Sequence, residues 1–163
     1  MDRIKVADET WLATALLHRE HPDRADFSIS EIVDRAEREK LTPRLRPGVR
    51  VHATSHCVAE LAPSPARLCM LHVSGPGRRR LFRPGDPIHP ARAGGKTAPR
   101  EADIPEAYRP LLAWYEREYL AGIWHEPPGE SRDSLLDLRG SGREVWADEH
   151  ADEYIERLRR EWS

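Results

Sequence analysis

The sequence lacks the features that mark membrane and secreted proteins. Its 163 residues include no apolar run of about 18, and the start MDRIKVADETWLATALL lacks the charged, apolar and small-residue succession of a signal peptide. We therefore expect a cytoplasmic protein without a membrane segment. Cysteine is also scarce. Cys57 and Cys69 have no CxxC spacing, so in a reducing compartment we expect two small buried residues rather than a disulfide.

Catalytic motifs are missing as well. There is no GxSxG, P-loop, GxGxxG or HExxH pattern. His52, His56 and Cys57 have a spacing that zinc accepts on a helix, but no second cluster completes a tetrahedral set. We therefore predict no enzyme activity, no cofactor and no metal. An enzyme that acts on nucleic acid through His56 stays as an alternative.

Aromatic residues are few, at 7%, whereas charged residues make up 33% of the chain. Average globular domains have roughly a quarter charged residues, so apolar material for a core is limited. The length allows one ordinary domain with an appendage. Residues 125–132 have the composition of a linker, with Pro127-Pro128-Gly129 at their centre. We therefore predict a domain over residues 1–122 and a tail over residues 123–163.

Charges of both signs are abundant but sorted along the chain. Residues 1–43 carry 7 Lys+Arg and 10 Asp+Glu, residues 44–100 carry 11 and 2, and residues 101–163 carry 8 and 16. The formal charges of the three segments are therefore -3, +9 and -8, which sum to -2. A basic segment with few acids is typical of contact with a phosphate backbone. We interpret the sorting as two faces for two different molecules.

Helical patterns occupy the first third of the chain. Asp8 is placed to cap a first helix, and Ser28 with Glu31 forms a capping box for a second. Apolar residues at helical spacing predict a short third helix within residues 46–61. A later helix over residues 105–121, which begins with a proline, is expected to close the core.

A β-hairpin is expected after the third helix. Residues 68–73 and 78–82 have strand composition, and residues 74–77 are a turn; the Pro, Gly and Arg-rich residues 83–99 are read as a loop that wraps the domain or contacts phosphate. Three helices and a hairpin are the element order of a winged helix-turn-helix. The predicted fold is therefore α+β: a winged helix-turn-helix with an additional C-terminal helix and an extended helical tail.

Candidate nucleic-acid contacts lie around the third helix and the hairpin. Arginine presents forked donors that suit phosphate, while hydroxyl and imidazole groups on a helix can read base edges. The alternative is that the hairpin arginines only prevent edge-to-edge pairing of strands. The predicted contacts are Arg44, Arg46, Arg50, Thr54, Ser55, His56, Arg67, Arg78, Arg79, Arg80 and Arg83.

The end of the chain has an apolar pattern that it cannot bury by itself. It either folds back on the domain or binds a partner. The segment SLLDLRGSGREVWADEHADEYIERLRREW resembles the toxin-neutralising tail of VapB-type and related antitoxins. The resemblance implies a PIN-type ribonuclease as partner, with Arg139 or Arg143 near the carboxylates that hold the toxin's metal ion. The implied apolar contacts are Leu135, Leu136, Leu138, Trp146, Ile155, Leu158 and Trp162.

Residues from about 8 to 119 are similar to an uncharacterised winged-helix domain of bacteria and archaea, through ETWLATALLHRE, FSISEIV, RPGVRVHATSHCVA and GRRRLFRPGD. That resemblance implies no established activity. The chain also departs from ordinary VapB-type antitoxins, which are shorter and usually carry a ribbon-helix-helix or AbrB-like DNA-binding part. The resulting hypothesis is an antitoxin-like DNA-binding protein that autoregulates its operon. The alternative is a stand-alone regulator without a toxin, whose tail closes the core or forms a homodimer.

Overall fold

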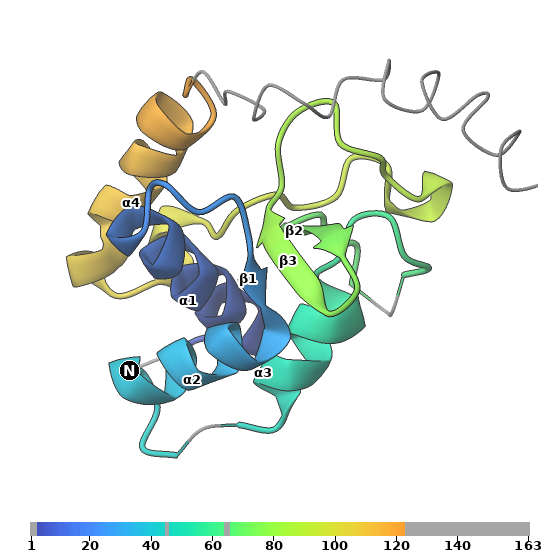
Figure 1. Cartoon of the computed structure of the whole chain (residues 1–163). Coiled ribbons are helices and arrows are strands. Elements are labelled where there is room, and N and C mark those ends of the chain that lie inside the picture. The colour runs from blue at the N-terminus through green and yellow to red at the C-terminus, as the bar shows by residue number, and fades with distance from the viewer. Residues whose placement is uncertain (1–2, 45, 64–65, 123–163) are drawn as a thin grey trace, which may run out of the picture. The chain divides into compact units, whose positions relative to one another are not determined.

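The computed structural model describes residues 3–44, 46–63 and 66–122 (Figure 1). Over these residues the fold is α+β, with four α-helices and a small three-stranded antiparallel sheet. None of the helices among them is long and apolar enough to cross a membrane. The predicted tail, with all of its candidate partner-binding residues, lies outside the described residues.

The first helix, α1 (Val6–Glu20), is the most deeply buried element. Trp11, Leu12 and Ala15 on it are fully buried. The expectation that Asp8 caps this helix was wrong. Lys5 occupies the N-cap position, and Asp8 lies buried in the first turn. Its carboxylate instead forms an ion pair with a residue distant in the sequence: Oδ1 lies 2.6 Å from Nζ of Lys96.

The second helix, α2 (Ile29–Glu39), begins at the predicted capping box. The hydroxyl of Ser28 accepts from the amide of Glu31 at 3.1 Å, and the Glu31 carboxylate accepts from the amide of Ser28 at 2.8 Å. The helix ends at Lys40, whose backbone is left-handed with φ 54°. Local chemistry between neighbours in the sequence therefore sets this helix, which explains why the pattern was sufficient to find it.

The predicted third helix is present over residues 48–56. It consists of α3 (Gly48–Val51) and a wider π-helical turn, His52–His56. Val49 and Ala53 are fully buried against the rest of the fold. The helix ends at Cys57, whose side chain is also buried. Both cysteines are buried and free, as expected.

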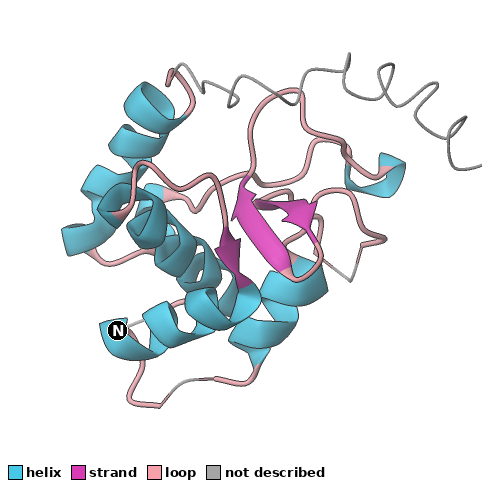
Figure 2. Ribbon diagram, in the orientation of Figure 1, coloured by secondary structure: helices cyan, strands magenta, loops and turns pink. Residues whose placement is uncertain are grey.

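The hairpin forms the larger part of the sheet (Figure 2). Strands β2 (Leu71–Gly75) and β3 (Arg78–Leu81) pair in antiparallel register, with an irregularity between Val73 and Gly75. A third strand, β1 (Phe27–Ser28), was not predicted. It pairs with β3, so the sheet order is β1-β3-β2. Two residues are too few for an alternating pattern to be recognisable.

The loop after the hairpin and the last helical region close the core. The loop 83–99 is mostly irregular. Tyr115 and Tyr119 are buried, and their hydroxyls donate to the carbonyls of Phe82 at 2.5 Å and Leu81 at 2.9 Å. The expected core-closing helix is therefore confirmed, as a succession of short turns. These turns are η4 (Glu106–Tyr108), α4 (Arg109–Trp114) and η5 (Tyr115–Tyr119), and two separate single turns, η2 (Pro90–Arg92) and η3 (Glu101–Asp103), precede them.

Candidate nucleic-acid interface

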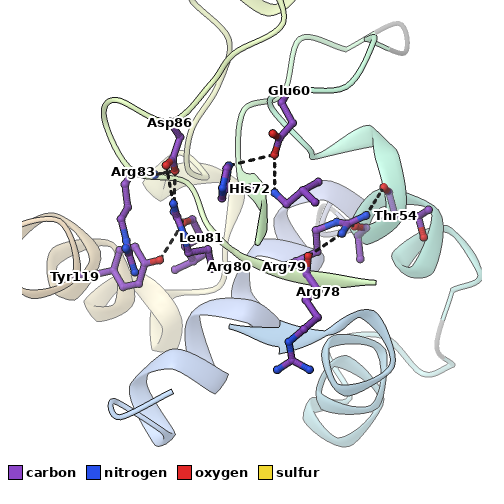
Figure 3. A network of polar contacts seen from close by, with 12 residues as sticks. Thr54, Glu60, His72, Arg78, Arg79, Arg80, Leu81, Arg83, Asp86 and Tyr119 are labelled. Atoms are coloured by element: carbon purple, nitrogen blue, oxygen red, sulfur yellow. Dashed lines mark hydrogen bonds and ion pairs between the residues drawn. The ribbon is translucent and has the colours of Figure 1, made fainter. Parts of the chain in front are cut away.

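The three consecutive arginines of strand β3 point to three different parts of the fold (Figure 3). Arg78 projects away from the hairpin, and its Nε donates to Oδ1 of Asp26 at 2.7 Å. Its side chain remains 41% exposed. The side chains of a strand alternate between its two sides, so a run of arginines cannot present one continuous charged surface.

Arg79 lies on the buried side of the strand. It is 6% exposed, and its guanidinium donates to the carbonyls of Ala53 and Thr54, both at 3.0 Å, and of Arg78 at 2.7 Å. Burial lowers the pKa of this guanidinium. Its donors therefore serve the third helix, rather than the phosphate contact expected from the sequence.

Arg80 is held by Asp86 from the loop after the hairpin. Two parallel hydrogen bonds of 2.7 and 2.6 Å join the guanidinium to the carboxylate, and the amide of Arg83 donates to the same carboxylate at 2.7 Å. Burial raises the pKa of Asp86, but these hydrogen bonds outweigh burial and the pKa is lowered overall. The guanidinium carbon of Arg83 lies 5.2 Å from the ring centre of Tyr119 (Figure 3). The Arg80–Asp86 pair therefore holds the loop after the hairpin against strand β3.

The third helix exposes a short stretch of mixed chemistry. Arg50 and Thr54 are exposed, and Val51 between them is 45% exposed. The hydroxyl of Thr54 donates to the carbonyl of Arg50 at 2.7 Å, and that of Ser55 donates to the carbonyl of Val51 at 3.3 Å. Ser55 and His56, also predicted contacts, are only partly exposed. The solvent side of the helix therefore offers one cation, one apolar side chain and one hydroxyl.

His52, His56 and Cys57 do come together at the end of this helix. Nδ1 of His52 lies 3.4 Å from Sγ of Cys57, and the two imidazole rings are 4.9 Å apart. Burial, followed by the charges of His56 and Arg46, lowers the pKa of His52 to about 4. Burial raises the pKa of the Cys57 thiol. Across residues 3–44, 46–63 and 66–122, no group of three or more His, Cys, Asp or Glu is placed to hold a metal ion.

The remaining predicted arginines differ in what they contact. Arg46 is engaged inside the fold, where Nε donates to the fully buried Glu9 at 2.9 Å. Arg44, Arg50 and Arg67 are exposed, and no ion pair joins them to another described residue. Arg44 precedes the third helix and Arg50 lies on it. Exposed cations therefore remain beside this helix after the internal pairs are formed.

Acidic residues of the first segment neutralise part of the basic segment. Asp8 pairs with Lys96, and Asp26 pairs with Arg78 at 2.6 Å. Together with the Glu9 pair, these contacts join residues separated by 37 to 88 positions. The sorting of charge along the sequence is therefore reduced in the folded unit. Nothing in the local sequence around the three acids signals these partners.

Sequence reasoning also missed Arg92, in the loop read as wrapping the domain. Arg92 is fully buried and donates to five main-chain carbonyls, at distances between 2.6 and 3.1 Å. A single arginine among prolines and glycines gives no signal of such a position.

The chain matches no family model, no curated protein and no solved structure.

Proposed function

We propose that residues 1–122 are a winged-helix domain that binds duplex DNA. The element order α1, β1, α2, third helix, β2 and β3, with β3 central in the sheet, supports this arrangement. In helix-turn-helix proteins the second helix of the motif lies in the major groove. The third helix follows α2 directly in the chain, so it corresponds to the groove-binding helix in this proposal.

The observation that carries the proposal is the exposed stretch of the third helix. Arg50 is a donor for phosphate or guanine, and Val51 offers an apolar contact of the kind that a thymine methyl accepts. Thr54 follows one helical turn later and can exchange its local hydrogen bond for one to a base edge. The 45% exposed Val51 gives this stretch one apolar contact point beside its polar groups.

Salt dependence of binding tests which arginines contact phosphate. We expect Arg44→Ala, Arg50→Ala and Arg67→Ala each to reduce the slope of log K against log[salt] on duplex DNA by roughly 0.9 for each phosphate that the variant no longer neutralises. Arg80→Ala, which removes an internal partner of Asp86, should leave the slope unchanged. Arg117→Ala is the matched control, because Arg117 is exposed on η5 and changes the net charge equally.

Fluorescence anisotropy with labelled duplex DNA, single-stranded DNA and duplex RNA provides the measurement. Preference for duplex DNA is the expected result, since the wide major groove admits a helix and that of A-form RNA does not. Equal slopes for Arg50→Ala and Arg117→Ala would remove the third helix from the interface. Absence of binding to all three probes would refute the proposal.

We further propose that the tail neutralises a PIN-type ribonuclease toxin, which makes the whole chain an antitoxin-like regulator. The support is the resemblance of residues 134–162 to VapB-type tails, together with the excess of acids from residue 101 onward. The expected apolar contacts include Leu135, Trp146 and Leu158. A stand-alone regulator without a toxin is the competing function.

Two observations separate these functions. In an antitoxin operon, the neighbouring reading frame should encode a small protein with the spaced Asp and Glu residues of a metal-dependent nuclease. Co-expression with that product should preserve growth only when the tail is intact. A neighbouring frame without such acids, or a full chain that fails to bind its product, would favour the stand-alone regulator.

A further inference from the structure

The C-terminal end of the third helix is closed by two arginine side chains from elsewhere in the chain. The last carbonyls of a helix have no partner within it and are usually satisfied by a glycine-based turn or by water. Here four consecutive carbonyls, of residues 53–56, accept hydrogen bonds from guanidinium groups. We call Arg79 and Arg92 together the arginine cap.

The two arginines divide these carbonyls between them. Arg79 donates to Ala53 and Thr54, both at 3.0 Å, while Arg92 donates to Ser55 at 3.1 Å and His56 at 2.7 Å. The carbonyl of the following residue, number 57, accepts from the amides of residues 70 and 71. Every carbonyl from residue 53 to residue 57 is therefore occupied.

The electrostatics favour cations at this position. The carbonyl end of a helix carries a partial negative charge, so a guanidinium there is stabilised without a carboxylate. Neither Arg79 nor Arg92 forms an ion pair with a carboxylate of the described chain. Both are nine-tenths or more buried, and burial lowers the pKa of each. The interaction is thus between buried cations and main-chain dipoles.

The arginine cap links three segments into one body. Arg79 belongs to β3 of the hairpin, and Arg92 belongs to the turn η2. Arg92 also donates to the carbonyls of Leu61, Ala62 and Leu68, which lie between the third helix and the hairpin. These two side chains, together with the main-chain hydrogen bonds from residues 70 and 71 to the carbonyl of residue 57, therefore set the orientation of the third helix relative to the hairpin.

We infer that Arg79 and Arg92 are positioning residues for DNA sequence selectivity: they hold the exposed side of the third helix in register with the hairpin. The inference rests on the proposed DNA-binding function. Neither guanidinium is exposed enough to be the phosphate contact that the basic hairpin sequence suggested for Arg79. Their effect on DNA binding is exerted through the helix.

The test uses the full chain and the variants Arg79→Lys and Arg92→Lys. Lysine keeps the charge but cannot span two carbonyls as the planar fork does. The probes are a duplex that the wild-type chain enriches from a randomised pool and a scrambled duplex of equal length. We expect the ratio of the two Kd values to fall roughly tenfold or more, the discrimination of one good base contact, while the salt slope is retained.

Arg35→Lys is the matched control for loss of stability. Arg35 is a buried arginine with partners on α1 and α2, Glu20 and Glu39, rather than on the third helix. It should lower the unfolding midpoint without changing selectivity. If Arg92→Lys does not fold, Arg79→Lys carries the test, because Arg79 donates to three main-chain carbonyls whereas Arg92 donates to five.

The outcomes separate the inference from the function beneath it. Unchanged selectivity in Arg79→Lys and Arg92→Lys overturns the inference alone. A salt slope that falls by about 0.9 in Arg79→Ala identifies that residue as a phosphate contact and also overturns it. A wild-type chain that enriches no duplex overturns the proposed function and the inference together.

Discussion

Glu9 is a buried charge whose partners come from distant positions. Its carboxylate is 1% exposed and accepts from Arg46, and Oγ1 of Thr42 lies 3.4 Å from it. We expect Glu9→Gln to lower the free energy of unfolding by about 3 kcal/mol, because it leaves a partly buried guanidinium without its counter-charge. Urea unfolding measures the effect. The double variant Glu9→Gln/Arg46→Gln should recover part of the loss, and strict additivity would argue against the pair.

His18 makes the stability of the protein depend on pH. Its Nε2 accepts from the amide of Leu81 at 3.3 Å, which requires the neutral imidazole. Burial is the largest cause that lowers its pKa, from 6.5 to about 3. Its nearest aromatic neighbours are Phe27 and Tyr119, with ring centres at 4.9 Å. The charged groups around it are Arg83, Arg80 and Arg24, which lower the pKa, and Asp26, which raises it.

The expected consequence is a loss of stability in acid. The unfolded chain binds a proton at His18 near pH 6.5, whereas the folded chain does so only near pH 3. Between these values the free energy of unfolding should fall as the pH falls, with a contribution of about 1.4 kcal/mol per pH unit. His18→Gln keeps an acceptor that does not titrate, so it should remove this contribution. An unchanged pH slope in urea unfolding would contradict the assignment.

At the scale of elements, the sequence was informative wherever a structure depends on neighbours. The capping box of Ser28 and Glu31 located α2, and helical spacing located residues 48–56. Strand β1 was missed because its two residues acquire a partner only through β3. The same reason explains why Arg92 was missed. Its five acceptors lie 24 to 37 residues away, and no local pattern encodes them.

The tight turn of the hairpin depends on one glycine. Gly77 has φ +65°, a conformation that disfavours side chains, although a Cβ there would meet nothing within 4 Å. We expect Gly77→Ala to destabilise the fold by about 1 kcal/mol through backbone strain alone. Gly75→Ala is the control in the same hairpin, because a Cβ there would make only an ordinary contact, at 3.9 Å from Arg78. Thermal unfolding of both variants should show the larger destabilisation for position 77.

At the scale of the molecule, only part of the positive charge of the basic segment is exposed on the surface. The sequence showed how many charges of each sign the segments carry, but not that Asp8, Glu9 and Asp26 would reach into the basic segment. Ion pairs of this kind connect elements that are brought together by burial of apolar side chains. The hydrophobic periodicity of the sequence therefore cannot predict them. Among the described residues of the basic segment, the exposed Arg44, Arg50 and Arg67 form no ion pair and remain available to a ligand.

The two proposed functions, DNA binding and toxin neutralisation, should be lost separately. In the full chain, Arg50→Ala should weaken DNA binding and leave neutralisation of the neighbouring toxin intact, because the substituted side chain lies on the third helix. The double variant Leu135→Ala/Trp146→Ala should abolish neutralisation and leave the salt-dependent binding of DNA unchanged, while Arg117→Ala should affect neither. Growth under toxin expression and fluorescence anisotropy on DNA are the two measurements. A single variant that removes both activities at full stability would mean that the two segments serve one shared surface, and the division of the chain into a DNA-binding domain and a toxin-binding tail would then be wrong.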